Sequence, residues 1–198
     1  MYSLYSMCMD IKHFQVLSIT PLMLLIGLSA SHSSYAASNR QVNENQYIKM
    51  VVIPRTPQQM AAFYEGREFP KTAIDETRSA CFFTTVIHNK SKNIIQHDYS
   101  RWQLNTDATT VSLISKQQWK QRWKQLNIPQ RFQSTFRWTL LPEQLDFQAA
   151  EHEGGNITIL RQAAPFDLVA YFTTVEQEKI KTIRMEFKNL RCAEDTPQ

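Results

Sequence analysis

Several short segments are either apolar and rich in β-branched residues or alternate apolar and polar residues, and turn residues separate them, which predicts β-strands joined by turns. The clearest is 80–88, whose apolar residues fall on both faces, so we expect a central strand covered on both sides. Residues 89–93 form a polar turn, and we expect 94–98 to return as the second arm of a hairpin. The same reasoning predicts strands at 47–53, 102–104, 111–115, 132–141, 156–161, 165–174 and 179–192.

Two segments follow a helical period instead. Thr56 can cap a helix that Pro57 opens, and Gly66 lies where this helix should end. A second helix is predicted over 115–127, with Ser115 as its cap. The apolar residues recur at helical spacing in both helices: Met60, Phe63 and Tyr64 in the first, Trp119, Trp123 and Leu126 in the second.

The last strand changes parity near its end. Residues Ile183, Met185 and Phe187 share one face, whereas Leu190 and Cys192 fall on the other. We expect a β-bulge near Asn189 to return Cys192 to the core, where it can reach Cys81.

The N-terminal 37 residues have the pattern of a signal peptide. Lys12 and His13 precede an apolar run at 16–28, and small residues follow up to a cleavage site after Ala36 or Ala37. The run is about 13 residues long, shorter than the roughly 20 needed to cross a bilayer. We therefore expect 1–37 to be cleaved, 38–46 to form a flexible arm, and 47–198 to fold as one periplasmic or secreted domain without a membrane span.

Cleavage removes Cys8 and leaves two cysteines, Cys81 and Cys192, in an oxidising compartment. Such a pair is expected to form a disulfide. Their separation of 111 positions corresponds to about 4–5 kcal/mol of stabilisation in the loop-entropy model. The spacing excludes a Cys-x-x-Cys redox pair, so we do not expect a thioredoxin-like oxidoreductase.

The formal net charge is +4, and the densest cationic stretch is 116–131, where Trp119 and Trp123 are interleaved. An exported chain does not normally meet chromosomal nucleic acid, so no nucleic-acid partner is expected. The charge serves either solubility or attraction to anionic envelope surfaces.

The strand-rich pattern favours a β-sandwich. The stretch ACFFTTVIHNKSKNIIQHDYSRWQL (80–104) resembles the front half of secreted immunoglobulin-like modules of bacterial envelope proteins, and PFDLVAYFTT (165–174) resembles their later strands. The resemblance implies a mainly β, immunoglobulin-like β-sandwich, here with two short helical insertions. It also implies an accessory, binding or structural role, and it supplies no catalytic residues.

The sequence offers three candidate kinds of chemistry. His88 and His97 flank the predicted hairpin but are not directly opposed in it, so a metal site there needs a register shift or help from Asp98. Carboxylates in 143–153 are spaced irregularly, as in a solvated loop, so acid–base hydrolysis is the weakest hypothesis. No Gly-x-Ser-x-Gly elbow occurs, and the mature chain has only three glycines, which disfavours nucleotide binding. We expect no cofactor.

The remaining signal is tryptophan close to arginine, a combination suited to binding a protein or glycan partner. The sequence therefore predicts a non-enzymatic binding or accessory protein of the cell envelope. The alternative is a periplasmic copper- or zinc-handling protein that uses His88 and His97. The candidate partner-binding residues are Arg101, Trp102, Arg122 and Arg137.

Overall fold

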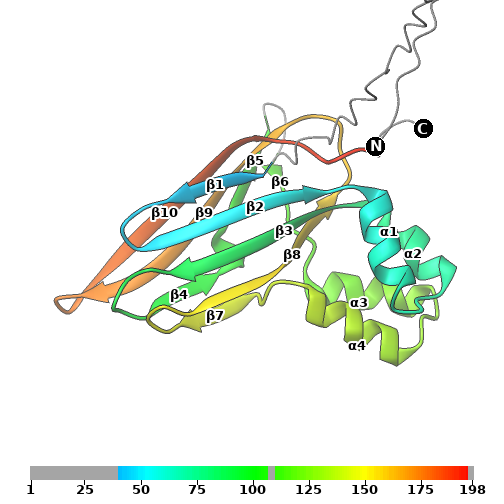
Figure 1. Ribbon diagram of the computed structural model, residues 1–198, viewed down its shortest axis with the longest axis horizontal. Coiled ribbons are helices and arrows are strands. Elements are labelled where there is room, and N and C mark those ends of the chain that lie inside the picture. Colours follow the sequence, from blue (N-terminus) through cyan, green and yellow to red (C-terminus); the bar gives the residue numbers. More distant parts are fainter. Residues whose placement is uncertain (1–39, 107–109, 196–198) are drawn as a thin grey trace, which may run out of the picture. The chain divides into compact units, whose positions relative to one another are not determined.

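The computed structural model describes residues 40–106 and 110–195. Within this part the chain is mainly β, with two antiparallel sheets and four α-helices gathered at one end of the sheets (Figure 1). The predicted leader lies outside the described residues. None of the helices in the described part is long and apolar enough to cross a membrane.

The first sheet has four strands, in the order β1 (Gln41–Glu44), β2 (Ile48–Arg55), β3 (Ala80–Asn89) and β8 (His152–Leu160). The predicted central strand is confirmed, because β3 pairs with β2 on one edge and with β8 on the other. Its two faces are both covered: Phe83 packs into the core between the sheets, and Phe82 packs against the helices.

The second sheet is built around β9 (Phe166–Glu176). One edge of β9 pairs with β10 (Lys179–Leu190), and the other pairs with β4 (Ile95–Asp98) and β5 (Gln103–Asn105). A 3₁₀ turn, η1 (Tyr99–Arg101), separates β4 from β5. Two short strands complete the sheet, β7 (Gln144–Phe147) beside β4 and β6 (Thr110–Val111) beside β5.

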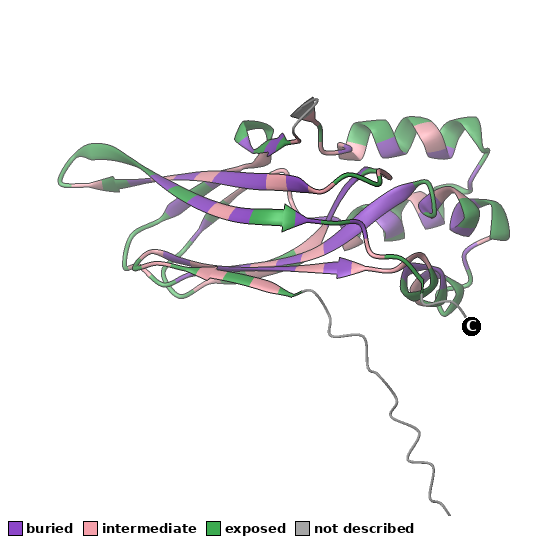
Figure 2. Ribbon diagram, turned by 90° about the horizontal axis from the view of Figure 1, so that it is seen from above, coloured by how far each residue is buried: buried purple, intermediate pink, exposed green. Residues whose placement is uncertain are grey.

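The two sheets pack face to face around one apolar core. Alternate residues of each strand point into it, among them Ile87 from the first sheet and Phe172 and Met185 from the second. Figure 2 shows the buried and exposed positions alternating along these strands. This alternation is what the period of two predicts for half-buried strands.

The predicted disulfide and bulge are both confirmed. Cys81 and Cys192 are joined, with their Cα atoms 5.3 Å apart. The register of β10 against β9 shifts between Phe187 and Leu190. Asn189 has φ of 54° there and donates its amide hydrogen to Asp167. The bulge therefore turns Leu190 and Cys192 toward the core.

The predicted hairpin of 80–88 with 94–98 is wrong, because β3 and β4 belong to different sheets. The polar segment between them crosses from one sheet to the other. Asn89 holds this crossing: its buried Nδ2 donates to the carbonyl oxygens of Asn93, Phe147 and Gln148. A polar pentapeptide between two apolar strands is equally compatible with a hairpin and with a sheet crossing, so the sequence pattern was ambiguous here.

The strand predicted at 132–141 is also wrong, since this segment lies mostly in helix α4 (Gln130–Thr139). Its aromatic residues are typical of a strand. Phe132 and Phe136, however, are spaced i, i+4, and both are buried on one helical face. Pro129 precedes the helix as its N-terminal cap residue. Tertiary packing of that face overrides the β propensity of the segment.

The first predicted helix is confirmed as α1 (Pro57–Glu65), with Thr56 as its cap. Thr56 also forms a capping box with Gln59. Helix α3 (Lys116–Gln125) confirms the second, with a capping box between Ser115 and Gln118. Helix α2 (Lys71–Thr77) was not predicted. The described chain thus carries four helices where two insertions were expected, and they enclose a second apolar cluster against β3.

The arm expected at 38–46 is in part a strand, because residues 41–44 form β1 and pair with β2. Side chains of β1 also reach across to the edge of the second sheet. Gln41 donates to the carbonyl of Lys188, and Asn43 donates to that of Glu186. These bonds secure a polar segment that has little apolar surface to bury.

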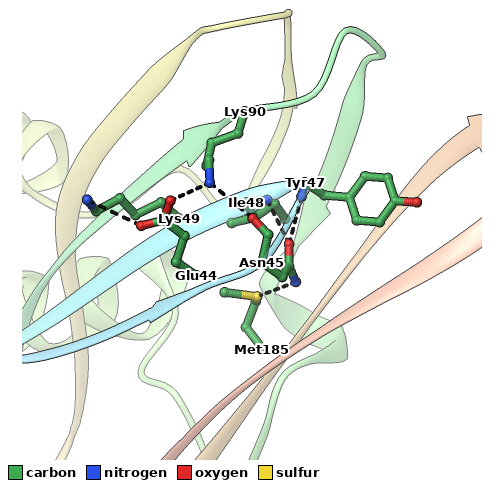
Figure 3. A network of polar contacts seen from close by, with 7 residues as sticks. All are labelled: Glu44, Asn45, Tyr47, Ile48, Lys49, Lys90 and Met185. Carbon is green, nitrogen blue, oxygen red and sulfur yellow. Dashed lines mark hydrogen bonds and ion pairs between the residues drawn. The ribbon is translucent and has the colours of Figure 1, made fainter.

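The turn after β1 is held by the network in Figure 3. The side-chain oxygen of Asn45 accepts two backbone N–H groups of the following residues, and its Nδ2 contacts the sulfur of Met185. Glu44 forms ion pairs with Lys49, at 3.4 Å, and with Lys90. The turn between β1 and β2 is therefore linked to Lys90, which follows β3, and to Met185 on β10.

Candidate functional site

A groove lies between helices α3 and α4, which form a helical hairpin beside the sheets (Figure 1). Its cavity volume is about 290 Å³. The α3 wall contains Lys116, Gln117 and Lys120. The α4 wall contains Gln130, Gln133, Ser134 and Arg137.

The local sequence explains the hairpin. The capping box at Ser115 starts α3, and Asn127 ends the turn after it in a left-handed conformation with φ of 52°. Asparagine tolerates this region better than most residues do. Ile128 then donates its amide hydrogen to the carbonyl of Trp123, and Pro129 directs the chain into α4.

Aromatic rings beneath the groove fix the hairpin to the first sheet. Trp119 and Trp123 are stacked with ring centroids 5.1 Å apart, and Phe136 lies within 4.9 Å of both. Trp119 donates its Nε1–H to Thr158 on β8 at 2.8 Å. The two tryptophans are only 1% and 2% exposed, so they act as core and not as stacking platforms for a ligand.

The helices around the groove are strongly cationic. Residues 116–139 contain no Asp or Glu, but they contain six cations: Lys116, Lys120, Arg122, Lys124, Arg131 and Arg137. Within the described part of the chain, Arg122 is the one member of this set in an ion pair, with Glu76 at 3.0 Å. Five of the six cations therefore form no ion pair within the described residues.

One end of the groove is closed by a carboxylate with defined partners. Glu143 accepts, on Oε1, the hydroxyl of Tyr99 and the backbone amide of Lys116, each at 2.7 Å. Burial, followed by the interaction with Glu143, raises the pKa of Tyr99 above its usual value. This carboxylate anchors the N-terminus of α3.

The Lys116 ammonium group lies in an unfavourable setting. Partial burial lowers its pKa most, and the positive charge of Arg137 lowers it further, while Glu143 opposes the shift. The charges of Lys116 and Arg137 are thus close enough to repel. An anion between them relieves that repulsion.

Two polar atoms of the groove residues lack partners. The Nε1 of Trp123 and the Oε1 of Gln133 are buried and form no hydrogen bond in the structure. Buried polar groups are usually paired.

The four predicted partner-binding residues do not form one surface. Arg137 lines the groove. Arg122 is on the same hairpin but pairs with Glu76 of α2, and it also donates to Ser79, just after α2, at 3.2 Å. Trp102 is 6% exposed, in the core between the sheets, and Arg101 is exposed on η1.

The structure also separates the two candidate metal ligands. His97 is buried on β4, and its ring packs 5.0 Å from that of Trp102. His88 is on β3 in the other sheet, directly opposite His152 on β8, with ring centroids 6.3 Å apart. Among residues 40–106 and 110–195, no three or more metal-ligating side chains are grouped.

The carboxylates of 143–153 have structural contacts. Glu143 is engaged as described, and Glu151 accepts the amide of Gln148 at 2.6 Å within the turn before β8. Neither arrangement pairs two carboxylates around a shared site. The groove residues Lys116 and Lys120 were not predicted individually, although both lie in the cationic stretch at 116–131 that the sequence reveals.

Comparison with protein-family models, with characterised proteins and with solved structures finds no match to this chain. The geometry and charge of the groove are therefore the features from which a function can be inferred.

Proposed function

We propose that this protein is an exported, non-enzymatic accessory protein of the cell envelope that binds an anionic partner at the groove between α3 and α4. The observation that carries the proposal is the charge of residues 116–139. This segment contains six cations and no carboxylate, and five of the cations have no ion pair in the described structure. Three of them, Lys116, Lys120 and Arg137, line a groove of about 290 Å³ to which Glu143 adds a single carboxylate.

Such a concentration of unneutralised charge has a physical consequence. Like charges repel and destabilise the folded state, so a protein gains nothing in stability from gathering them. Their combined field does attract anions and raises the rate of encounter, over a range of about 10 Å at 0.1 M salt. Elsewhere in the described chain cations are often paired, for example Lys49 and Lys90 with Glu44.

Export is supported by the signal-peptide pattern of 1–37 and by the cysteine pair, which suits an oxidising compartment. We also propose an immunoglobulin-like topology. The order β2-β3-β8 in one sheet and β10-β9-β4 in the other corresponds to strands A-B-E and G-F-C of that fold. The cell-envelope setting and the accessory role remain part of the proposal.

The binding site is tested by retention on phosphocellulose at increasing salt. The double variant Lys120→Gln/Arg137→Gln should elute at clearly lower salt than the wild type. The matched control is Lys92→Gln/Arg78→Gln, which removes the same charge at exposed positions outside the hairpin. If both double variants shift equally, retention reflects net charge alone and the groove assignment is wrong.

Export is tested by the intact mass of the protein recovered from the periplasm, measured without reductant and after thiol alkylation. We expect loss of 36 or 37 residues and no alkylation of Cys81 or Cys192. A retained leader or reactive thiols contradict the exported state.

The alternative, a metal-handling protein, now depends on a different histidine pair. His88 and His152 face each other across adjacent strands, which is a suitable start for a copper or zinc site, although such sites need further ligands. Elemental analysis of protein purified without a His-tag decides this. Metal well below one equivalent removes the alternative, and a stoichiometric amount that His152→Ala abolishes favours it.

A further inference from the structure

Both helices that line the groove also carry a stripe of exposed residues. On α3 the exposed residues Gln117, Lys120, Gln121 and Lys124 recur at i, i+3, i+4 and i+7. On α4 the exposed residues Arg131, Ser134, Thr135 and Trp138 recur in the same way. Each set therefore occupies one side of its helix. We call these eight residues the hairpin face.

Lys120 and Ser134 also line the groove, so the hairpin face adjoins it on both walls. The exposed sides of the helices are visible as green ribbon in Figure 2.

Trp138 is the unusual member of this face. It is 81% exposed, whereas Trp102, Trp119 and Trp123 are all at most 6% exposed. The guanidinium carbon of Arg137 lies 5.9 Å from its ring centroid. An indole has a large apolar body and one N–H donor, and such residues are enriched where water meets a membrane.

We propose that the hairpin face docks on the surface of a bilayer that contains anionic phospholipid, with Trp138 in the headgroup region and lipid phosphates against the cations. This inference rests on the proposed function, because it names the anionic partner of the same site.

The distribution of charge favours a surface over a small anion. The cations extend along two helices of ten residues, each about 15 Å long. Lys116, Lys120 and Arg137 line the groove, whereas Lys124 and Arg131 lie outside its lining, so a small anion held in the groove leaves these two unpaired. A layer of lipid headgroups presents many phosphates across that span.

The exposed tryptophan favours a bilayer over a soluble polyanion. Phosphate or carboxylate groups on a polymer neutralise lysine and arginine but need no exposed indole. A membrane interface uses both features, because basic residues are attracted to anionic lipid while an aromatic ring inserts among the headgroups.

The test is co-sedimentation of the full exported chain with vesicles of phosphatidylglycerol mixed with phosphatidylcholine, and with vesicles of phosphatidylcholine alone. We expect binding to the anionic vesicles only, and weaker binding as salt is raised. Each of Lys120→Gln and Lys124→Gln should weaken partitioning by about fivefold, and Lys92→Gln should leave it nearly unchanged.

Trp138→Ala should weaken vesicle binding by roughly tenfold while elution from phosphocellulose stays the same. Fluorescence provides a second measurement, since Trp138 is the exposed tryptophan of the described chain. Its emission should shift to shorter wavelength on anionic vesicles and be quenched by brominated lipid, and Trp138→Ala should remove both changes.

Three results overturn the membrane inference. Equal binding to both vesicle types shows that anionic lipid is not recognised. Groove-dependent retention on phosphocellulose without vesicle binding refutes the bilayer but leaves the proposed function intact. Binding of polygalacturonate, weakened by Lys120→Gln/Arg137→Gln, without any binding to the anionic vesicles identifies an acidic glycan as the partner instead. If Lys120→Gln/Arg137→Gln changes no interaction beyond its matched control, the proposed function fails as well.

Discussion

The backbone amide of Lys116 donates a 2.7 Å hydrogen bond to Oε1 of Glu143, and the hydroxyl of Tyr99 donates to the same oxygen. One carboxylate thus joins the first turn of α3, the segment that follows α4, and η1. A negative charge at a helix N-terminus is also favoured by the helix dipole. Glu143 therefore stabilises the hairpin that carries the cations.

Glu143→Gln should destabilise the fold by about 1–2 kcal/mol, because charge-assisted hydrogen bonds become neutral ones. The same change removes the one carboxylate lining the groove, so elution from phosphocellulose should move to higher salt. Urea unfolding and salt elution measure the two effects. Glu65→Gln, at an exposed position on α1, is the control for both. Unchanged stability contradicts the anchoring role.

His97 should make the fold sensitive to acid. Burial lowers its pKa below 6.5, while the bond to the Pro142 carbonyl and the charge of Asp98 oppose the shift. Its Nε2 lies 2.9 Å from the oxygen of Pro142, and its Nδ1 is buried without a partner. Protonation adds a charge to Nδ1 in the core, so the folded state disfavours it.

The unfolded chain therefore binds a proton more readily than the folded chain as pH falls below 6.5. Stability from neutral His97 is complete above that pH and is lost with a slope of up to about 1.4 kcal/mol per pH unit below it. Urea midpoints at several pH values test this. His97→Gln, whose amide can still donate to Pro142, should flatten the curve relative to the wild type. Identical slopes refute the role of His97.

Gly155 is required where β8 passes the end of α4. A Cβ at this position would lie 2.4 Å from the backbone nitrogen of Leu141, too close for any side chain. Gly154 is the matched control, since its nearest atoms would be 3.6 Å away. We expect Gly155→Ala to cost about 3 kcal/mol or prevent folding, and Gly154→Ala to cost much less. Thermal unfolding distinguishes them, and equal losses contradict the close approach.

The Cys81–Cys192 bridge links the central strand β3 to the end of the chain across a separation of 111 positions. Replacing both cysteines with alanine should reduce the free energy of unfolding by about 4–5 kcal/mol in the loop-entropy model. Urea unfolding of the oxidised wild type, the reduced wild type and the double variant measures this. The reduced wild type and the double variant should have similar free energies of unfolding. If the double variant loses less than about 1 kcal/mol relative to the oxidised wild type, the entropic account is contradicted.

Sequence patterns predicted much of the β framework. Apolar segments bounded by turn residues located β2, β3 and β9, alternation located β10, and the change of parity at Asn189 located the bulge. These features depend on neighbouring residues, because the pleat alternates side chains and a bulge must appear as a parity change. The cap residues Thr56 and Ser115, with apolar residues at helical spacing after them, located two helices for the same local reason.

Other elements were ambiguous locally. Segment 132–141 has both strand-like aromatic content and helical spacing of Phe132 and Phe136. Residues 41–44 have no apolar period, yet they form β1 through pairing with β2 and side-chain bonds to β10. The choice in each case depends on the surface against which the segment packs.

By itself, the sequence determined the periodic strands, the two capped helices, and the cysteine pair left after the expected cleavage, since each is a property of a few residues or of a count. Tertiary structure alone decided that β3 and β4 belong to different sheets, that His88 faces His152 and not His97, and that Lys116, Lys120 and Arg137 line one groove. The physical reason is that these relationships join residues distant in the chain, and their relative positions follow from burying apolar faces of separate elements against one another.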